Sequence, residues 1–188
     1  MRRFFLIALL IQFALIHSAH ALILVEPLVG YNFGTYRQKV FTTKSTIASN
    51  GIAYGGRLGL QWMGVQVAAD YLRSTLSPEN DRIENDIQMQ ETGLFIGYEF
   101  ALFLRLYAGI MMNGTGEFMH PQDGKVKFSE PNGTKAGVSF TALPLFAINL
   151  EWRKGTFSNV VVDGTKDRFF KVKFEAFLLS LSMPVNLF

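Results

Sequence analysis

Large apolar side chains alternate with glycine, small polar or charged residues in eight segments of this sequence. In one segment, Phe146, Ile148, Leu150 and Trp152 alternate with Ala147, Asn149, Glu151 and Arg153. A period of two residues is that of a β-strand with two different faces. The apolar face is bulky and continuous, whereas the other face carries charges that a soluble core would not accept. The sequence therefore predicts a barrel whose apolar face points outward.

The first 21 residues have the features of a secretory signal peptide. Arg2 and Arg3 precede an apolar run over residues 4–16, and Ala19-His20-Ala21 offers a small-x-small cleavage pattern. The rival interpretation is an uncleaved anchor, but the run is shorter than the ~20 residues of a helical membrane span. We therefore expect a signal peptide over 1–21 and one barrel domain over 22–188. Removal of the signal leaves 16 basic and 15 acidic side chains, which gives no indication of nucleic-acid binding.

Eight strands are predicted, and the spaces between them alternate in length. The expected strands cover 24–34, 52–62, 65–72, 90–100, 104–112, 135–142, a segment from 146, and part of 169–184. Gaps after the second, fourth and sixth strands are two or three residues, while the other gaps are long and polar. Asp123-Gly124 and Asp163-Gly164 are tight-turn signals inside two long gaps, where strands are expected to extend as hairpins. Both termini then lie at the short-turn end.

Aromatic residues gather near both ends of the outward face. Tyr31, Phe33, Tyr54, Tyr71 and Trp152 fall near one rim, and Trp62, Tyr98, Phe100 and Phe146 fall near the other. Two aromatic girdles are typical of lipid interfaces. A secreted soluble barrel also has alternating strands, but it does not account for the girdles or for an outward face with so little charge.

On these features, the chain resembles the small eight-stranded outer-membrane barrels, the superfamily of the OmpA transmembrane domain, OmpX and Ail. The resemblance covers residues 22–188. It implies an all-β, antiparallel, up-and-down transmembrane barrel in the bacterial outer membrane, with long loops extracellular and termini periplasmic. It also implies that Phe188 is read by the outer-membrane insertion machinery. Apolar residues of the last strand lie in the opposite phase to Phe188, so either Pro184 marks a bulge or Lys171, Lys173 and Glu175 stand above the membrane.

The inward face carries seven charged residues that we interpret as a structural network. Register from the two short turns places Arg57 opposite Asp70 and Glu99 opposite Arg105, which predicts two cross-strand ion pairs. Catalysis or an ion path are alternatives, but eight strands enclose a space only wide enough for side chains. The network residues are Glu26, Arg57, Asp70, Glu99, Arg105, Glu151 and Arg153.

The predicted function is that of an integral barrel with a structural or interaction role and no enzymatic activity. The barrel domain has a single histidine, His120, and no serine or carboxylate beside it that would form a catalytic set. No catalytic residue, cofactor or metal site is predicted. A porin-like channel is the first alternative, and a lipid-modifying barrel enzyme is the next.

Expected partners are membrane lipid, lipopolysaccharide and a second copy of the chain. The basic cluster Arg37, Lys39 and Lys44 is a candidate for lipopolysaccharide phosphates, although exposed charge runs are often only solvated. Small outward residues, Gly56, Ala69 and Ala108, permit close approach of another barrel, as a homo-oligomer would need. Ordinary variation in the size of lipid-facing residues is the alternative.

Overall fold

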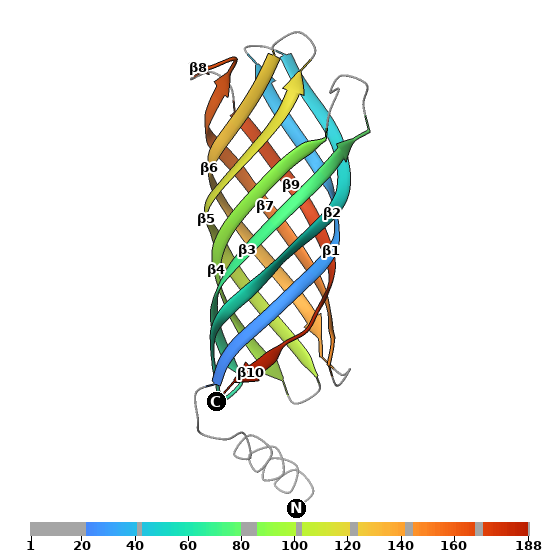
Figure 1. Cartoon of the computed structure of the whole chain (residues 1–188), viewed down its shortest axis with the longest axis vertical. Helices are drawn as coiled ribbons and strands as arrows, with labels where there is room; N and C mark the ends of the chain where they lie inside the picture. The colour runs from blue at the N-terminus through green and yellow to red at the C-terminus, as the bar shows by residue number, and fades with distance from the viewer. Residues whose placement is uncertain are drawn as a thin grey trace, which may run out of the picture.

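The computed structural model describes residues 22–40, 43–79, 86–100, 103–120, 124–141, 145–167 and 171–187. These residues form one antiparallel sheet that closes into a barrel with both ends of the sheet joined (Figure 1). The strands are β1 (Leu22–Val40), β2 (Thr43–Trp62), β3 (Val65–Pro78), β4 (Ile87–Phe100), β5 (Leu104–His120), β6 (Gly124–Phe140), β7 (Ala147–Val162), β8 (Thr165–Asp167), β9 (Lys171–Ser182) and β10 (Val185–Leu187).

Closure takes place where the last long strand pairs with the first. β9 pairs with β7 on one side and β1 on the other, and β10 continues the contact with the start of β1. β8 is the returning arm of a hairpin at the tip of β7. The described residues therefore place eight strands around the circumference of the barrel, as the alternation predicted. Backbone groups in the wall are paired all round, which is the condition for a sheet to cross lipid.

Two of the three predicted short turns are confirmed, at Met63-Gly64 and between Phe100 and Leu104, but the long gaps are mostly strand. The third turn, predicted at 143–145, lies mostly outside the described residues, between β6 and β7. Trp62 pairs with Val65 across a turn in which Met63 and Gly64 both have positive φ, as a two-residue hairpin requires. At the other end, β1 runs six residues beyond the predicted limit and pairs with β2 as far as Val40 and Thr43. The prediction of long irregular loops there was wrong. The polar residues continue the ladder because their outward faces meet water rather than lipid.

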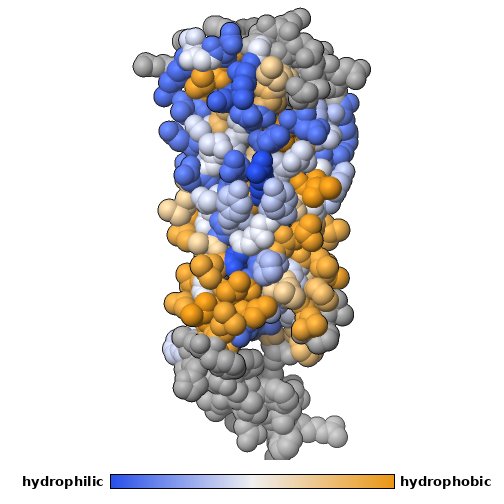
Figure 2. All heavy atoms as spheres, in the orientation of Figure 1, coloured by the Kyte–Doolittle hydropathy of each residue, from blue (hydrophilic) through white to orange (hydrophobic). Residues whose placement is uncertain are grey.

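The polarity of the wall reverses about halfway along the barrel. In the half nearer the termini, the outward side chains are apolar and the inward ones are largely polar. In the half nearer the long-loop end, the outward side chains are polar, and Figure 2 shows this change as a blue upper wall above an orange lower one. The lower half has the surface that a bilayer covers, and the upper half has the surface that water covers.

Thirteen buried apolar side chains fill the interior of the upper half, and we call them the apolar plug. A row of four aromatic rings crosses the plug through β1, β9, β7 and β6. The ring centroids are 6.0 Å apart for Tyr36 and Phe174, 5.3 Å for Phe174 and Phe157, and 4.5 Å for Phe157 and Phe128. Burial raises the pKa of the Tyr36 hydroxyl above its ordinary value, so this residue stays neutral. The plug comprises Tyr36, Ile47, Leu76, Ile87, Met89, Met111, Phe118, Val126, Phe128, Phe157, Val160, Val172 and Phe174.

Alternation shifts phase once in each of three neighbouring strands. Met112 and Asn113 of β5 are both exposed, and the register with β4 shifts between Thr92 and Gly93. The inward phase also changes at Ser129 and Glu130 of β6 and again at residues 158–159 of β7. An extra residue turns the following side chains to the other face. The shifts lie on neighbouring strands, so the apolar interior of the upper half remains continuous.

The last strand keeps its register through Pro184, so the predicted bulge there is wrong. β9 pairs Leu28 of β1 with Ser182, and β10 pairs Val25 with Val185 in the same frame. Of the two interpretations, the structure supports the one in which the charges lie above the apolar belt, because Lys173 and Glu175 lie on the outer wall of the polar half. The outward apolar residues are Phe177, Leu179, Leu181, Met183, Val185 and Leu187.

Two sequence predictions concern parts of the chain beyond those described. The signal peptide over 1–21 and the insertion signal at Phe188 lie outside the described residues. Within the described residues, no helix has the length and apolar character of a membrane span.

The apolar plug is expected to contribute strongly to stability, because its rings pack where neither lipid nor water reaches them. Replacement of the fully buried Phe157 by alanine should lower the free energy of unfolding by about 3–5 kcal/mol. Urea-dependent unfolding in detergent measures the change. Phe140→Ala, on the exposed outer face of the lower half, is the matched control, and an equal loss in both variants would contradict the assignment.

Candidate functional site: interior ion pairs and a basic outer pocket

Glu26 is the centre of the polar interior. Its carboxylate lies 2.5 Å and 3.0 Å from the two terminal nitrogens of Arg105, and the Ser182 hydroxyl donates to it at 2.6 Å. Arg105 also donates to Ser139 and to Asn149, each at 3.2 Å. Glu26 and Arg105 are completely buried. Arg105 also donates to Gln66 at 3.1 Å, so the guanidinium joins β5 to partners on β1, β3, β6 and β7.

Arg57 and Arg153 continue the network across the lumen. Arg57 of β2 donates to Glu151 of β7 and to the Tyr107 hydroxyl of β5, each at 3.0 Å. Arg153 lies 3.2 Å from the other oxygen of Glu151 and is paired with Glu91. Each charge thus has a partner of opposite sign, as burial in a medium of low dielectric requires. This arrangement binds the walls to one another and fills the space between them.

The predicted registers are confirmed, but the predicted ion pairs are wrong. Arg57 stands opposite Asp70, and Glu99 stands opposite Arg105. Both arginines reach across the lumen instead, because in a narrow barrel a long inward side chain meets the far wall. Asp70 pairs with Lys135 of β6. Glu99 is near the short-turn end and accepts hydrogen bonds from Gln61, Gln66 and Thr141.

Two interior charges were missing from the sequence prediction. Glu91 and Lys135 are 3% and 2% exposed, and they pair with Arg153 and Asp70. Both follow from the alternation, because Glu91 lies two residues before inward Gly93 and Lys135 lies two before inward Gly137. Gly93 also makes room for the second pair, since a Cβ there would lie 2.9 Å from both the Asp70 carboxylate and the Lys135 ammonium.

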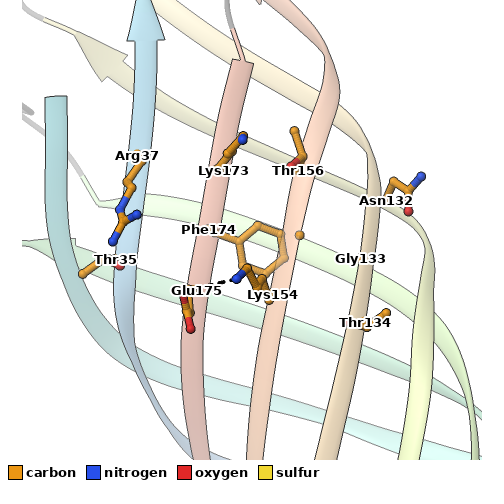
Figure 3. Close-up of a pocket in the computed structure, with 11 residues that line it drawn as sticks. Thr35, Arg37, Asn132, Gly133, Thr134, Lys154, Thr156, Lys173, Phe174 and Glu175 are labelled. Atoms are coloured by element: carbon orange, nitrogen blue, oxygen red, sulfur yellow. Dashed lines mark ion pairs between the residues drawn. The ribbon is translucent and has the colours of Figure 1, made fainter. Parts of the chain in front are cut away.

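Cations gather in a pocket of about 400 Å³ on the outer wall, above the apolar belt. Figure 3 shows Arg37 from β1, Lys173 from β9 and Lys154 from β7 around it, with the Phe174 ring at its floor. We call this the basic pocket. Lys154 pairs with Glu175 at 4.0 Å, and the Trp152 indole also donates to Glu175 at 3.2 Å.

Register brings like charges together at the basic pocket. Arg37 stands directly opposite Lys173 across the β1 and β9 seam. Like charges directly opposite one another destabilise a sheet. Arg37 belongs to the basic cluster predicted from the sequence, whereas the side chains of Lys39 and Lys44 lie outside those described.

The three small residues predicted as a barrel contact all lie on the outer face, where Ala69 and Ala108 are exposed and Gly56 is half-buried. Gly56 and Ala69 line one apolar trough, while Ala108 lies one outward row nearer the short-turn end than Ala69 and does not line it. Among the described residues, no group of three metal-ligating side chains comes together. The His120 backbone is in β5, and its side chain is not among those described.

Two solved structures resemble the whole barrel. Ail, the attachment invasion locus protein of Yersinia pestis, has a TM-score of 0.56 and 14% identity, over 86% of this chain and 98% of Ail. This is the fold of the small eight-stranded outer-membrane barrels. Neisserial surface protein A shares it, with a TM-score of 0.51 and 14% identity over 86% of this chain and 96% of that one. No protein-family model and no curated protein sequence matches the chain.

The resemblance expected from the sequence is thus confirmed for the fold. A second Ail structure, with a TM-score of 0.53 and 15% identity over 87% of this chain and 99% of that one, holds the heparin analogue sucrose octasulfate. At such low identity the shared barrel does not transfer a ligand or an activity.

Loss of Arg105 should leave the Glu26 carboxylate buried beside fewer cations. We expect Arg105→Ala to lower the free energy of unfolding by about 3–5 kcal/mol, the cost of breaking a buried pair from one side. Urea titration of the refolded barrel gives the value. Lys166→Ala, at an exposed position on β8, is the control. A loss no greater than that of the control would exclude a structural role for Arg105.

The cross-lumen partners also predict an energetic coupling. A double-mutant cycle should give a larger coupling energy for Arg57 with Glu151 than for Arg57 with Asp70, although only Asp70 is its neighbour in register. Alanine and asparagine or glutamine variants, unfolded in urea, supply the four free energies of each cycle. Stronger coupling to Asp70 would restore the cross-strand pairs that the sequence suggested.

Proposed function

We propose that this chain is an integral barrel of the bacterial outer membrane with a structural and interaction role, and that the basic pocket binds phosphate groups of lipopolysaccharide. The proposal rests on the register of β1 and β9, which places Arg37 directly opposite Lys173. Two cations held opposite each other repel unless an anion lies between them, so an anionic ligand relieves this repulsion.

The position of the basic pocket along the barrel supports an anion at the membrane surface. The next outward row below the pocket is Phe33, Phe177 and Trp152, which belongs to the aromatic girdle. Such rings sit at the level of lipid headgroups. Phosphates of the surrounding glycolipid lie at this level, and the pocket meets them if the long-loop end is extracellular. The orientation is part of the proposal, as is the absence of enzymatic activity.

Binding of lipopolysaccharide should depend on the opposed cations. In a zwitterionic detergent at low salt, Arg37→Ala with Lys173→Ala should weaken binding at least tenfold, since charge-assisted contacts to phosphate are lost. Added salt should weaken binding by the unmodified protein. Lys166→Ala is the matched control. Equal affinity in all three proteins would overturn the proposed phosphate site.

Location and orientation have a separate test. In cells, the folded chain should sediment with the outer membrane, and added protease should reach an epitope placed between β7 and β8 but not one placed directly before β1, after the expected cleavage site. The reverse accessibility would refute the orientation. Conductance across a planar bilayer would favour the porin alternative instead.

A further inference from the structure

A large apolar trough lies on the outer wall within the apolar belt. Its volume is about 970 Å³, and it crosses the wall from β1 to β5. Gly56 and Ala69 form its floor, because their small side chains leave the wall low between Leu58, Tyr71 and Leu94. Most lipid-facing positions of the belt carry bulky side chains, so the trough is a hollow in an otherwise full surface.

A polar pocket of about 440 Å³ lies directly beyond the trough toward the long-loop end. Register establishes the contact between the two. The outward row Tyr71, Thr92 and Asn113 borders the trough, and the next row on the same face, Arg73, Gln90 and Thr115, lines the polar pocket. Neighbouring rows are about 7 Å apart, so one elongated molecule can occupy both spaces.

The aromatic girdle is open where the trough meets the polar pocket. On β1, β2, β3, β7 and β9 the rim carries Phe33, Tyr54, Tyr71, Trp152 and Phe177, but on β4 and β5 the same level carries Thr92 and Asn113. Asn113 faces outward because of the β5 bulge at Met112. The Thr92 hydroxyl donates to the Asn113 carbonyl at 3.4 Å, so small polar groups line the passage between the trough and the polar pocket.

The two cations of the polar pocket are spaced for a headgroup with an anion at each end. Arg73 is on β3 and Lys127 is on β6, so three strand spacings, about 14 Å, separate their backbones. One phosphate cannot bridge that span. Glu117 also lines the pocket and stands opposite Lys127 in register, but its carboxylate pairs with Lys125 at 3.0 Å. Among the described residues, no carboxylate lies within ion-pair distance of Arg73 or Lys127. Amides and hydroxyls between them, from Gln88, Gln90 and Thr115, match the groups of a sugar.

We propose that the trough and the polar pocket together hold one molecule of lipid A, the acylated and phosphorylated disaccharide of lipopolysaccharide. Its acyl chains lie over Gly56 and Ala69, its sugars lie at Gln88 and Gln90, and its phosphates meet Arg73 and Lys127. The basic pocket differs, since bulky aromatic rings stand below it and leave no space for chains. The inference shares with the proposed function the orientation of the barrel and the ligand, lipopolysaccharide, but the two sites use different residues.

The test measures lipid A retained through purification by native mass spectrometry. Measured in the Arg37→Ala with Lys173→Ala background, which removes the basic pocket, the protein should hold one molecule. Ala69→Leu, which fills the trough from the lipid side, and Arg73→Ala with Lys127→Ala should each reduce retention at least tenfold. Ala108→Leu enlarges a small outward residue outside the trough and should retain lipid A. A deacylated lipid A headgroup should fail to displace the lipid.

Several results would overturn the inference. Retention by Ala69→Leu equal to that by Ala108→Leu would show that the trough holds no chain. Displacement by the deacylated headgroup would show that the chains contribute nothing. A dimer that Ala69→Leu alone converts to monomer, with unchanged lipid content, would show that a second barrel covers the trough. If Arg37→Ala with Lys173→Ala keeps full binding of lipopolysaccharide while Ala69→Leu loses lipid A, the proposed phosphate site fails and this inference stands.

Discussion

The pairing of β9 with β1 is the contact on which the rest of the structure depends. Hydrocarbon offers no partner for a backbone N–H or C=O group, so a sheet crosses a bilayer only when it has no free edge. Closure gives every strand an inner and an outer face, and it fixes the inner space at eight strands. The narrow lumen then forces the long side chains of Arg57 and Arg105 to reach across it, and it limits interior charges to those that find a partner.

The reversal of polarity follows from the length of the strands. Strands that continue beyond the bilayer meet water on the outside. The outward positions of β1 and β7 therefore carry Phe33 and Trp152 at the membrane surface, and Arg37 and Lys154 above it. The interior changes in the opposite sense, from the Glu26 and Arg105 pair to the apolar plug. The lower half is held together by hydrogen-bonded charges, and the upper half by packed apolar side chains, as in a soluble barrel. The same hydrogen-bonded strands thus run through both halves, although different contacts hold the interior of each half together.

Much of the fold could be predicted from the sequence because alternation and short turns are local signals. Once Trp62 is opposite Val65, the register places Arg57 opposite Asp70, and the structure has both pairings. Most of the ion pairs could not be predicted, since they join residues from walls on opposite sides of the lumen, as Arg57 and Glu151 do. The exception is Glu26, which stands opposite Arg57 on the neighbouring strand and lies 3.5 Å from it. Strand length was also underestimated. An amphipathic strand in water and a polar loop have similar composition, and the turn signals Asp123-Gly124 and Asp163-Gly164 marked only two of the extensions.

The outer sites could be predicted only in part. The sequence singled out Arg37 and the small residues Gly56 and Ala69, but the rest of each site comes from residues that are neighbours only after closure or across several strands. Arg37 and Lys173 face each other at the seam, more than a hundred residues apart in the sequence.

Two glycines of the wall make room for aromatic rings of the plug. Gly155 lies over the Phe174 ring and Gly116 over the Phe128 ring, and a Cβ at either position would overlap the ring beneath. Plug residues therefore shape the outer wall: the rings fill the interior up to the backbone and form the floors of the basic pocket and the polar pocket. Stability of the upper half and the form of its outer surface thus depend on the same aromatic side chains.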